Sequence, residues 1–343
     1  MKGRHLLICV LIILLLLPAG AEAADTPRIE FYITHYIGHV GRESSVVVSC
    51  RTPRLMPADN NVFELRNQRG EVLAAKEWNN PASRLTFRFT VPESALGGNE
   101  LSVWLNGTDV TAEHAYAAYS DLKDPRVTCL TPETPAIALT IVCGGGGSRE
   151  VEEILAVLER HQVKCTFFLG GGWLEGHAED ARRILAAGHE IGSHGYRHVR
   201  MTEMEDYRSM RSVITKLNDR CEALLGVRPL LFRAPYSDTN QKVTALVRAE
   251  GMEEIQWSID SQDWADKYRG KPRQILQRVT GKEAVSGAVI QFHLNGYNTA
   301  QVLDEAIPIY REERGLQVVT VGEMLTLSGR ELPELPGTSG AAD

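Results

Sequence analysis

The sequence predicts a small all-β sandwich domain followed by an α/β domain built on a parallel sheet or barrel. Over residues 28–106, short segments alternate apolar and polar residues and are separated by Gly, Pro and Asn, which is typical of an antiparallel sandwich. From residue 136 onward, apolar strands alternate with amphipathic helices, as in parallel sheets and barrels. In such folds the C-terminal ends of the strands carry the chemistry.

The first 23 residues are predicted to be a secretory signal peptide. Lys2 and Arg4 precede an apolar run from Leu6 to Leu17, and an A-x-A site ends at Ala23. The run is shorter than the roughly 20 residues that span a bilayer, although an uncleaved anchor is the alternative. We therefore expect an exported protein, extracellular or in the cell envelope, whose only membrane contact would be an uncleaved signal segment.

Composition narrows the choice of partners. The 343 residues carry a formal net charge of −7, with 43% hydrophobic and 24% charged residues, which indicates folded domains. Nucleic acid is not expected as a partner, because phosphate binding calls for clustered Lys and Arg. Oligomeric state is not indicated.

We expect an accessory sandwich domain and linker over 24–127, the α/β domain over 128–328, and a flexible polar tail over 329–343.

The first strand of the α/β domain runs through "IALTIVC" into four glycines and a helix beginning near Glu150. This glycine run lacks the Gly-Lys-Ser/Thr of a phosphate loop, so a nucleotide site is not expected. At a catalytic strand end we would look for acids, yet Val142 and Cys143 stand there. The sequence therefore questions whether the chain is an enzyme, an altered enzyme or a former one.

Four later strand ends carry polar residues. In "GSHGYRH", His194 and His198 are four residues apart and can bind one metal, or they are loop histidines without that role. In "FRAPY", Arg233 could clamp a carboxylate and the turn at Pro235 and Tyr236 could present a backbone N–H, or this is an ordinary turn. The segments "WSIDSQDW" and "IQFH" supply an aspartate and a histidine for acid–base chemistry, which are Asp260 or Asp263 and His293.

The order and spacing of these motifs resemble the polysaccharide deacetylase family, the carbohydrate esterase 4-like proteins with a NodB-homology domain. The resemblance covers about Ala136 to Leu325, and "GHEIGSHGYRH…TEME" is similar to the branch that includes sporulation-associated deacetylases. It implies a deformed (β/α) barrel that binds a divalent metal, often zinc, and hydrolyses N-acetyl groups on a polysaccharide.

The resemblance also implies roles for single residues. His194 and His198 would be metal ligands, Arg233 would orient the catalytic base, and the backbone near Tyr236 would contact the oxyanion. Asp263 would tune His293, the general acid. Trp264 and Pro235 would contact substrate, and Gln291, where leucine is usual, would alter only the lining.

The first motif departs from the family form T-F-D-D-G, in which the first Asp is the base and the second a metal ligand. Here Val142 and Cys143 take their places. Loss of a positioned base typically costs about 10²–10⁴-fold in rate, unless Glu150, Asp260 or the metal itself substitutes. Arg233 would also lack its carboxylate partner, which Asp260 or a bound anion could replace.

Cys143 admits two interpretations. It could complete a zinc site with His194 and His198, or it could be a small apolar residue filling the space of a lost ligand. The four glycines that follow favour the second. Two functions stay open: a weak or altered deacetylase of a cell-wall or related glycan, and a catalytically inactive glycan-binding protein of the cell envelope. A purely structural role explains the later motifs least well.

Overall fold

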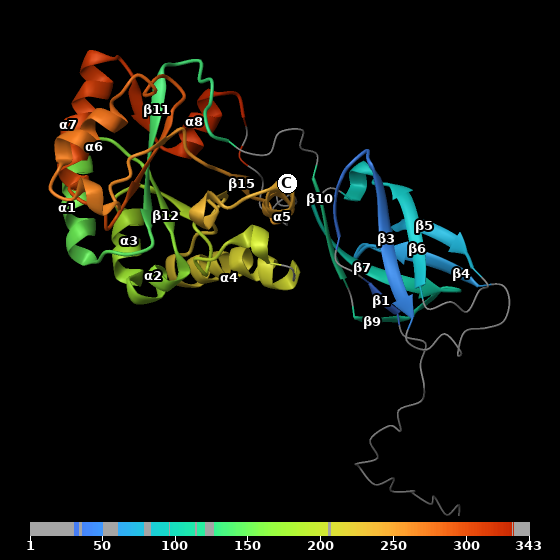
Figure 1. The fold of residues 1–343 in the computed structure, drawn as a ribbon. Coiled ribbons are helices and arrows are strands. Elements are labelled where there is room, and N and C mark those ends of the chain that lie inside the picture. Colours follow the sequence, from blue (N-terminus) through green and yellow to red (C-terminus); the bar gives the residue numbers. More distant parts are fainter. Residues whose placement is uncertain are drawn as a thin grey trace, which may run out of the picture.

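The computed structural model describes residues 31–33, 36–50, 61–78, 84–95, 97–113, 115–120, 127–204, 207–330 and 332. It contains an N-terminal β-sandwich and a C-terminal α/β domain, which confirms the predicted fold class (Figure 1). The predicted signal peptide and nearly all of the predicted tail lie outside the described residues. Within these ranges, no helix has both the length and the apolar character that crossing a membrane requires.

The sandwich consists of two sheets. One has the strand order β6-β3-β1-β9 and the other the order β2-β10-β7-β4-β5, with β8 beside β7. Alternate residues of β3, such as Val46 and Val48, point inward and pack with Phe63, Leu65 and Phe87. The strands are β1 (Phe31–Ile33), β2 (Tyr36–His39), β3 (Glu43–Cys50), β4 (Val62–Arg66), β5 (Val72–Glu77), β6 (Arg84–Thr90), β7 (Gly97–Leu105), β8 (Thr108–Asp109), β9 (Thr111–Glu113) and β10 (Ala115–Ser120), with a 3₁₀ turn at Glu93–Ala95.

The prediction of a purely antiparallel sandwich was wrong in two places. The pairs β1–β9 and β2–β10 are parallel, whereas the other strand pairs described in this domain are antiparallel. Each parallel pair joins a strand from the beginning of the domain to one from its end. Such long-range pairing leaves no trace in the local alternation of apolar and polar residues.

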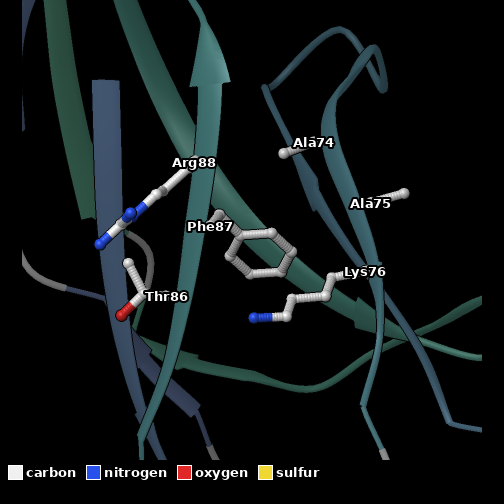
Figure 2. A pocket seen from close by; sticks show the side chains of 6 residues that line it. All are labelled: Ala74, Ala75, Lys76, Thr86, Phe87 and Arg88. Carbon is white, nitrogen blue, oxygen red and sulfur yellow. The ribbon is translucent and has the colours of Figure 1, made fainter. Parts of the chain in front are cut away.

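A pocket of about 360 Å³ lies between β5 and β6, which are edge strands of different sheets. Figure 2 shows Phe87 and Lys76 projecting into the space between these strands, whereas Thr86 and Arg88 point to the other side of β6. Ala74 and Ala75 complete the lining. None of these six residues is an acid or a histidine, so the pocket provides no acid–base pair.

The α/β domain is built on a curled, open sheet with the strand order β15-β14-β13-β12-β11-β17-β16, with β18 beside β11. All of the strand pairs described in this sheet are parallel. The strands are β11 (Ala136–Cys143), β12 (Thr166–Leu169), β13 (Glu190–Ser193), β14 (Leu231–Phe232), β15 (Glu253–Glu254), β16 (Ile259–Asp260), β17 (Val289–His293) and β18 (Gln317–Val319).

Helices cover the outer side of this sheet (Figure 1). Helix α1 shows why, because its apolar residues Val151, Ile154, Val157 and Leu158 recur at helical spacing and are all buried. The helices are α1 (Ser148–Arg160), α2 (Gly171–Gly176), α3 (Ala178–Ala186), α4 (Tyr207–Leu225), α5 (Gln241–Ala249), α6 (Pro272–Val279), α7 (Thr299–Pro308) and α8 (Val321–Leu327). Short 3₁₀ turns span Met201–Glu203, Pro235–Ser237 and Asp266–Tyr268, and a π-helical turn spans Ile309–Glu313.

The central strand β11 separates two apolar clusters. All eight of its residues are buried, because both faces of the strand are covered. Leu139, Ile141 and Cys143 alternate along one face and belong to the cluster that contains the helices. Ala138 and Val142 belong to the cluster inside the curled sheet. Consecutive residues at the end of β11 therefore face opposite sides of the sheet.

Candidate functional site

A pocket of about 620 Å³ lies at the C-terminal ends of the strands of the α/β domain. Its position agrees with the general rule that the sites of such sheets lie beyond these strand ends. Of the residues singled out from the sequence, the structure brings His194, His198, Tyr236, Trp264 and His293 together here. The full lining consists of Val142, Gly144, His194, His198, Arg200, Ala234, Tyr236, Ser237, Trp257, Asp260, Trp264, Gln291, His293 and Asn295.

His194 and His198 lie on the loop that follows β13, with their ring centres 5.2 Å apart. Gly195 between them has a φ of +77°, a left-handed conformation that favours glycine, and an added Cβ would lie 2.8 Å from the Val213 side chain. The Nδ1–H of His194 donates to the carbonyl of Arg233 at 2.9 Å. This bond fixes the ring and leaves Nε2 unprotonated, which is how metal-binding histidines are commonly oriented.

Both of these histidines are neutral at pH 7. Burial, and to a smaller extent the charge of the nearby His198, lower the pKa of His194 to about 3. Partial burial, followed by the charge of His293, also lowers the pKa of His198. The pair therefore offers two imidazoles in the form that binds metals.

His293 and Asp263 form a hydrogen-bonded pair at one side of the pocket. The Nδ1–H of His293 donates to Asp263 Oδ1 at 2.8 Å. Asp263 is fully buried, and its Oδ2 accepts from the backbone N–H of His293 at 3.0 Å and from Thr299 Oγ1 at 2.7 Å. The aspartate thus holds the imidazole in one orientation, with Nε2 as the ring nitrogen left free of this hydrogen bond.

The turn after β14 places an aromatic side chain on the pocket. Tyr236 and Ser237 have φ values of +58° and +55°, and such backbone strain in non-glycine residues is often found at functional sites. The ring of Tyr236 is 55% exposed and packs edge-on against His198, with ring centres 4.3 Å apart. Pro235 is buried and does not line the pocket, so its expected contact with substrate is not seen and its role is to shape the turn.

Arg233 is fully buried and is held by neutral acceptors. Its Nη1 donates to Thr140 Oγ1 at 2.7 Å and to Gln291 Oε1 at 3.4 Å. Its Nε and Nη2 donate to the carbonyls of Ile255 and Gln256, both at 3.1 Å. The guanidinium also lies 4.0 Å from the ring centre of Phe168, a distance at which a cation–π attraction operates.

No carboxylate is among these partners, so the acid expected beside Arg233 is replaced by a hydroxyl, an amide and two carbonyls. Burial lowers the pKa of Arg233 to about 9, and the charge of Asp260 opposes that shift. The guanidinium is therefore still a cation at neutral pH. Gln291 lines the pocket and also accepts a hydrogen bond from the buried Arg233. The expectation that it alters only the lining was therefore wrong.

Val142 and Cys143 have different environments. The Val142 side chain lines the pocket, whereas Cys143 is fully buried among the apolar residues beneath the helices and does not line it. In the part of the chain that the structure describes, no group of three or more His, Cys, Asp or Glu side chains could hold a metal ion. The proposed set of Cys143, His194 and His198 is therefore not assembled, because neighbouring residues of a strand face opposite sides.

The divalent metal implied by the family does not fit the residues present. Catalytic zinc sites use three protein ligands and leave one position open for water. His194 and His198 supply two of these ligands. The third candidate, Cys143, has its side chain on the other face of β11, directed away from the two histidines. Among the residues that the structure describes, this site therefore lacks a complete donor set of the usual kind.

Chemical labelling tests the orientation of Cys143. Because burial raises the pKa of its thiol, we expect iodoacetamide to modify the exposed Cys129 in the folded protein and Cys143 only after unfolding. Peptide mass mapping over time measures both reactions. Labelling of Cys143 as fast as that of Cys129 would show that its thiol reaches the pocket.

The two acids considered as replacements for the base lie in different places. Glu150 accepts a hydrogen bond from the backbone N–H of Gly147 at 2.9 Å, at the start of α1, and does not line the pocket. Asp260 does line it, and its Oδ1 accepts from the backbone N–H of Gln262 at 3.0 Å. Sequence reasoning missed Arg200 and Asn295, although Arg200 is only two residues beyond His198.

Comparisons with known proteins agree with this geometry. Residues 131–255 match the family model described as polysaccharide deacetylase. The protein YlxY of Bacillus subtilis is 31% identical over 194 residues, which is 57% of this chain and 58% of YlxY. The peptidoglycan-N-acetylmuramic acid deacetylase PdaC of the same organism is 28% identical over 203 residues, 58% of this chain and 41% of PdaC. This chain thus spans only about half the length of these relatives.

Among solved structures, the wild-type protein BA3943 of Bacillus anthracis, described as a CE4 family pseudoenzyme, superposes with a TM-score of 0.55. It is 26% identical, and the match covers 65% of this chain and 75% of BA3943. The curled parallel sheet and the family match lead to the same assignment. Over residues 131–255 the C-terminal domain thus matches the polysaccharide deacetylase (NodB/CE4) family in sequence, and its fold is similar to CE4 structures.

Proposed function

We propose that this protein is an exported pseudoenzyme of the cell envelope, which binds N-acetylated glycan in the pocket of its deacetylase domain without hydrolysing it at an appreciable rate. One observation carries the proposal. The side chain of Val142, to whose position the family resemblance assigns the catalytic base, lines the pocket, while Cys143, to whose position it assigns a metal ligand, is buried beneath the helices. Neither residue can take a proton from water in the pocket.

The groups that would recognise a sugar are still in the pocket. Trp264 and Tyr236 are 56% and 55% exposed, so their faces are available to the apolar side of a sugar ring. Ser237, Asp260 and Asn295 add polar groups that can bond to hydroxyl and amide groups. The pocket is therefore suited to binding a glycan.

Catalysis is a different matter. His293 and Asp263 form the pair that would protonate a leaving group, but a general base is missing, and its loss typically costs about 10²–10⁴-fold. We assign no role to zinc, because only His194 and His198 of the expected ligands face the pocket side of the site. PdaC acts on peptidoglycan by its name, so glycan of the peptidoglycan type is the proposed ligand.

The test combines calorimetric titration with an acetate assay on the same N-acetylated oligosaccharides. We expect binding without acetate release, and no comparable binding of the de-N-acetylated oligosaccharides. Trp264→Ala should weaken binding by about tenfold, equivalent to about 1.4 kcal/mol, because a stacking surface is lost. Tyr268→Ala is the matched control, since Tyr268 does not line the pocket. Turnover by the native chain, or failure to bind any N-acetylated oligosaccharide, would contradict the proposal.

A second candidate is a weak deacetylase in which Asp260 replaces the base. The supporting observation is that Asp260 is the one carboxylate among the residues that line this pocket of the described structure. In that case Asp260→Asn would abolish any residual acetate release by the native chain. Residual release that survives Asp260→Asn would exclude this role.

A further inference from the structure

We propose that Arg200 is a carboxylate-binding residue, and that it makes the pocket select N-acetylated sugars that carry an acidic substituent over neutral ones. The inference rests on the proposed glycan-binding function and names the class of sugar bound. Arg200 lines the pocket together with His198 and Tyr236, immediately before the 3₁₀ turn Met201–Glu203.

The side chain of Arg200 is held in place yet stays accessible. Its guanidinium carbon lies 4.8 Å from the ring centre of Tyr236, and its side chain is 51% exposed. A cation–π contact of this kind does not take up the N–H groups as hydrogen-bond donors, so they can still bind a ligand. Because Tyr236 also contacts His198, the arginine is positioned beside the centre of the site.

The neighbouring acids form no short hydrogen bonds with the guanidinium N–H groups of Arg200. Glu203 is 3.9 Å away and Asp238 is 3.8 Å away, both beyond the roughly 3.2 Å of a good N–H···O hydrogen bond. Asp238 already accepts from the backbone N–H of Thr202 at 2.8 Å and from its hydroxyl at 2.8 and 2.9 Å. A carboxylate entering the pocket could therefore form the paired hydrogen bonds that arginine makes best.

The charges around the pocket also suit one acidic group. Among the described residues that line it, Asp260 is the one carboxylate and Arg200 the one arginine. The buried cation of Arg233 lies next to the lining residue Gln291. Asp260 would repel a carboxylate placed beside it. An acidic substituent is therefore expected at the Arg200 side of the pocket.

The experiment measures the affinity of the full chain for two oligosaccharides of equal length, one made of N-acetylglucosamine and one containing N-acetylmuramic acid with its free carboxylate. We expect the native chain to prefer the acidic ligand by about 10- to 100-fold, and added salt to reduce that preference. Arg200→Ala should bring the ratio of the two affinities close to 1. Arg200→Lys should keep only part of it, because lysine lacks the planar fork.

Arg197→Ala is the matched control, because Arg197 is an exposed arginine of the same loop that does not line the pocket. It should keep the full preference. Equal binding of the two ligands by the native chain, or a preference that survives Arg200→Ala, would overturn the role of Arg200 while leaving glycan binding intact. Failure of the native chain to bind either ligand would instead overturn the proposed function itself, and this inference with it.

Discussion

Replacing Val142 and Cys143 together with aspartate is expected to raise the rate of acetate release by about 10²–10⁴-fold over the native chain. The side chain at position 142 lines the pocket, so an aspartate there would place a carboxylate where a base is needed. Thr140, two residues earlier on the same face of β11, already contacts Arg233. An aspartate at position 142 would therefore also lie near a guanidinium that has no carboxylate among its hydrogen-bonding partners.

The two substitutions should not contribute independently. Val142→Asp alone restores a base but leaves His194 and His198 as two donors, short of the three ligands of catalytic zinc sites. Cys143→Asp alone places a carboxylate in an apolar cluster, where its charged form is costly. We expect that variant to be less stable and inactive, unless the strand end turns toward the pocket. Most of the gain should therefore require added Zn²⁺ and both changes, with the end of β11 turning so that the aspartate at position 143 reaches the side of His194 and His198.

Initial rates of acetate release, with and without Zn²⁺, compare the native chain, both single variants and the double variant. The double substitution Val142→Ala and Cys143→Ala is the matched control, because it removes the same side chains without supplying carboxylates. Measurable acetate release by the native chain, equal to that of the double aspartate variant, would show that another group serves as the base. A folded but inactive double variant would show that the site lacks more than these two residues.

Much of the α/β domain could be predicted from local pattern. The strand predicted from "AIALTIVC" is β11, Ala136–Cys143, and the helix predicted over "EVEEILAVLERHQ" overlaps α1, Ser148–Arg160. Both segments have a clear apolar period, which reports burial directly. The parallel pairs β1–β9 and β2–β10 could not be predicted, because alternation shows which residues face inward but not which strands are partners.

The site was less predictable than the fold. Strand ends with polar residues indicated where the pocket lies, but the surroundings of Arg233 come from β11, β17 and the segment after β15, which are far apart in sequence. The sequence does contain one signal for the orientation of Cys143. Period-two alternation along β11 puts Val142 and Cys143 on opposite faces, which argues against Cys143 as a partner of His194 and His198.

The substitution Thr140→Val is expected to lower the free energy of unfolding by about 2–3 kcal/mol. Arg233 donates to the Thr140 hydroxyl at 2.7 Å, the shortest of its hydrogen bonds given above, and valine has nearly the same shape without the acceptor. Burial lowers the pKa of Arg233 in the folded state, so its charge already reduces stability at neutral pH and depends on these partners. Removing one of them leaves part of a buried cation unsatisfied.

Urea unfolding at pH 7 measures this cost, and Thr326→Val is the matched control. The Thr326 hydroxyl donates to the carbonyl of Gly322 within α8 and contacts no charged group in the hydrogen bonds described, so its loss should cost about 1 kcal/mol or less. If both variants lose a similar amount of unfolding free energy, the hydrogen bond from Arg233 to Thr140 stabilises the protein no more than an ordinary helix hydrogen bond does.

A double-mutant cycle shows whether Thr140 and Gln291 replace a missing acid. In a Val142→Asp background the new carboxylate can accept from Arg233, so we expect Thr140→Val to cost about 1–2 kcal/mol less than it does in the native chain. Gln291→Leu should behave in the same way but more weakly, because its oxygen lies 3.4 Å from the guanidinium. Equal costs in both backgrounds would mean that these neutral acceptors do not stand in for a carboxylate. A positive coupling would mean that the pocket is adapted to the absence of a base at position 142, because its buried cation is stabilised by groups that take no part in proton transfer.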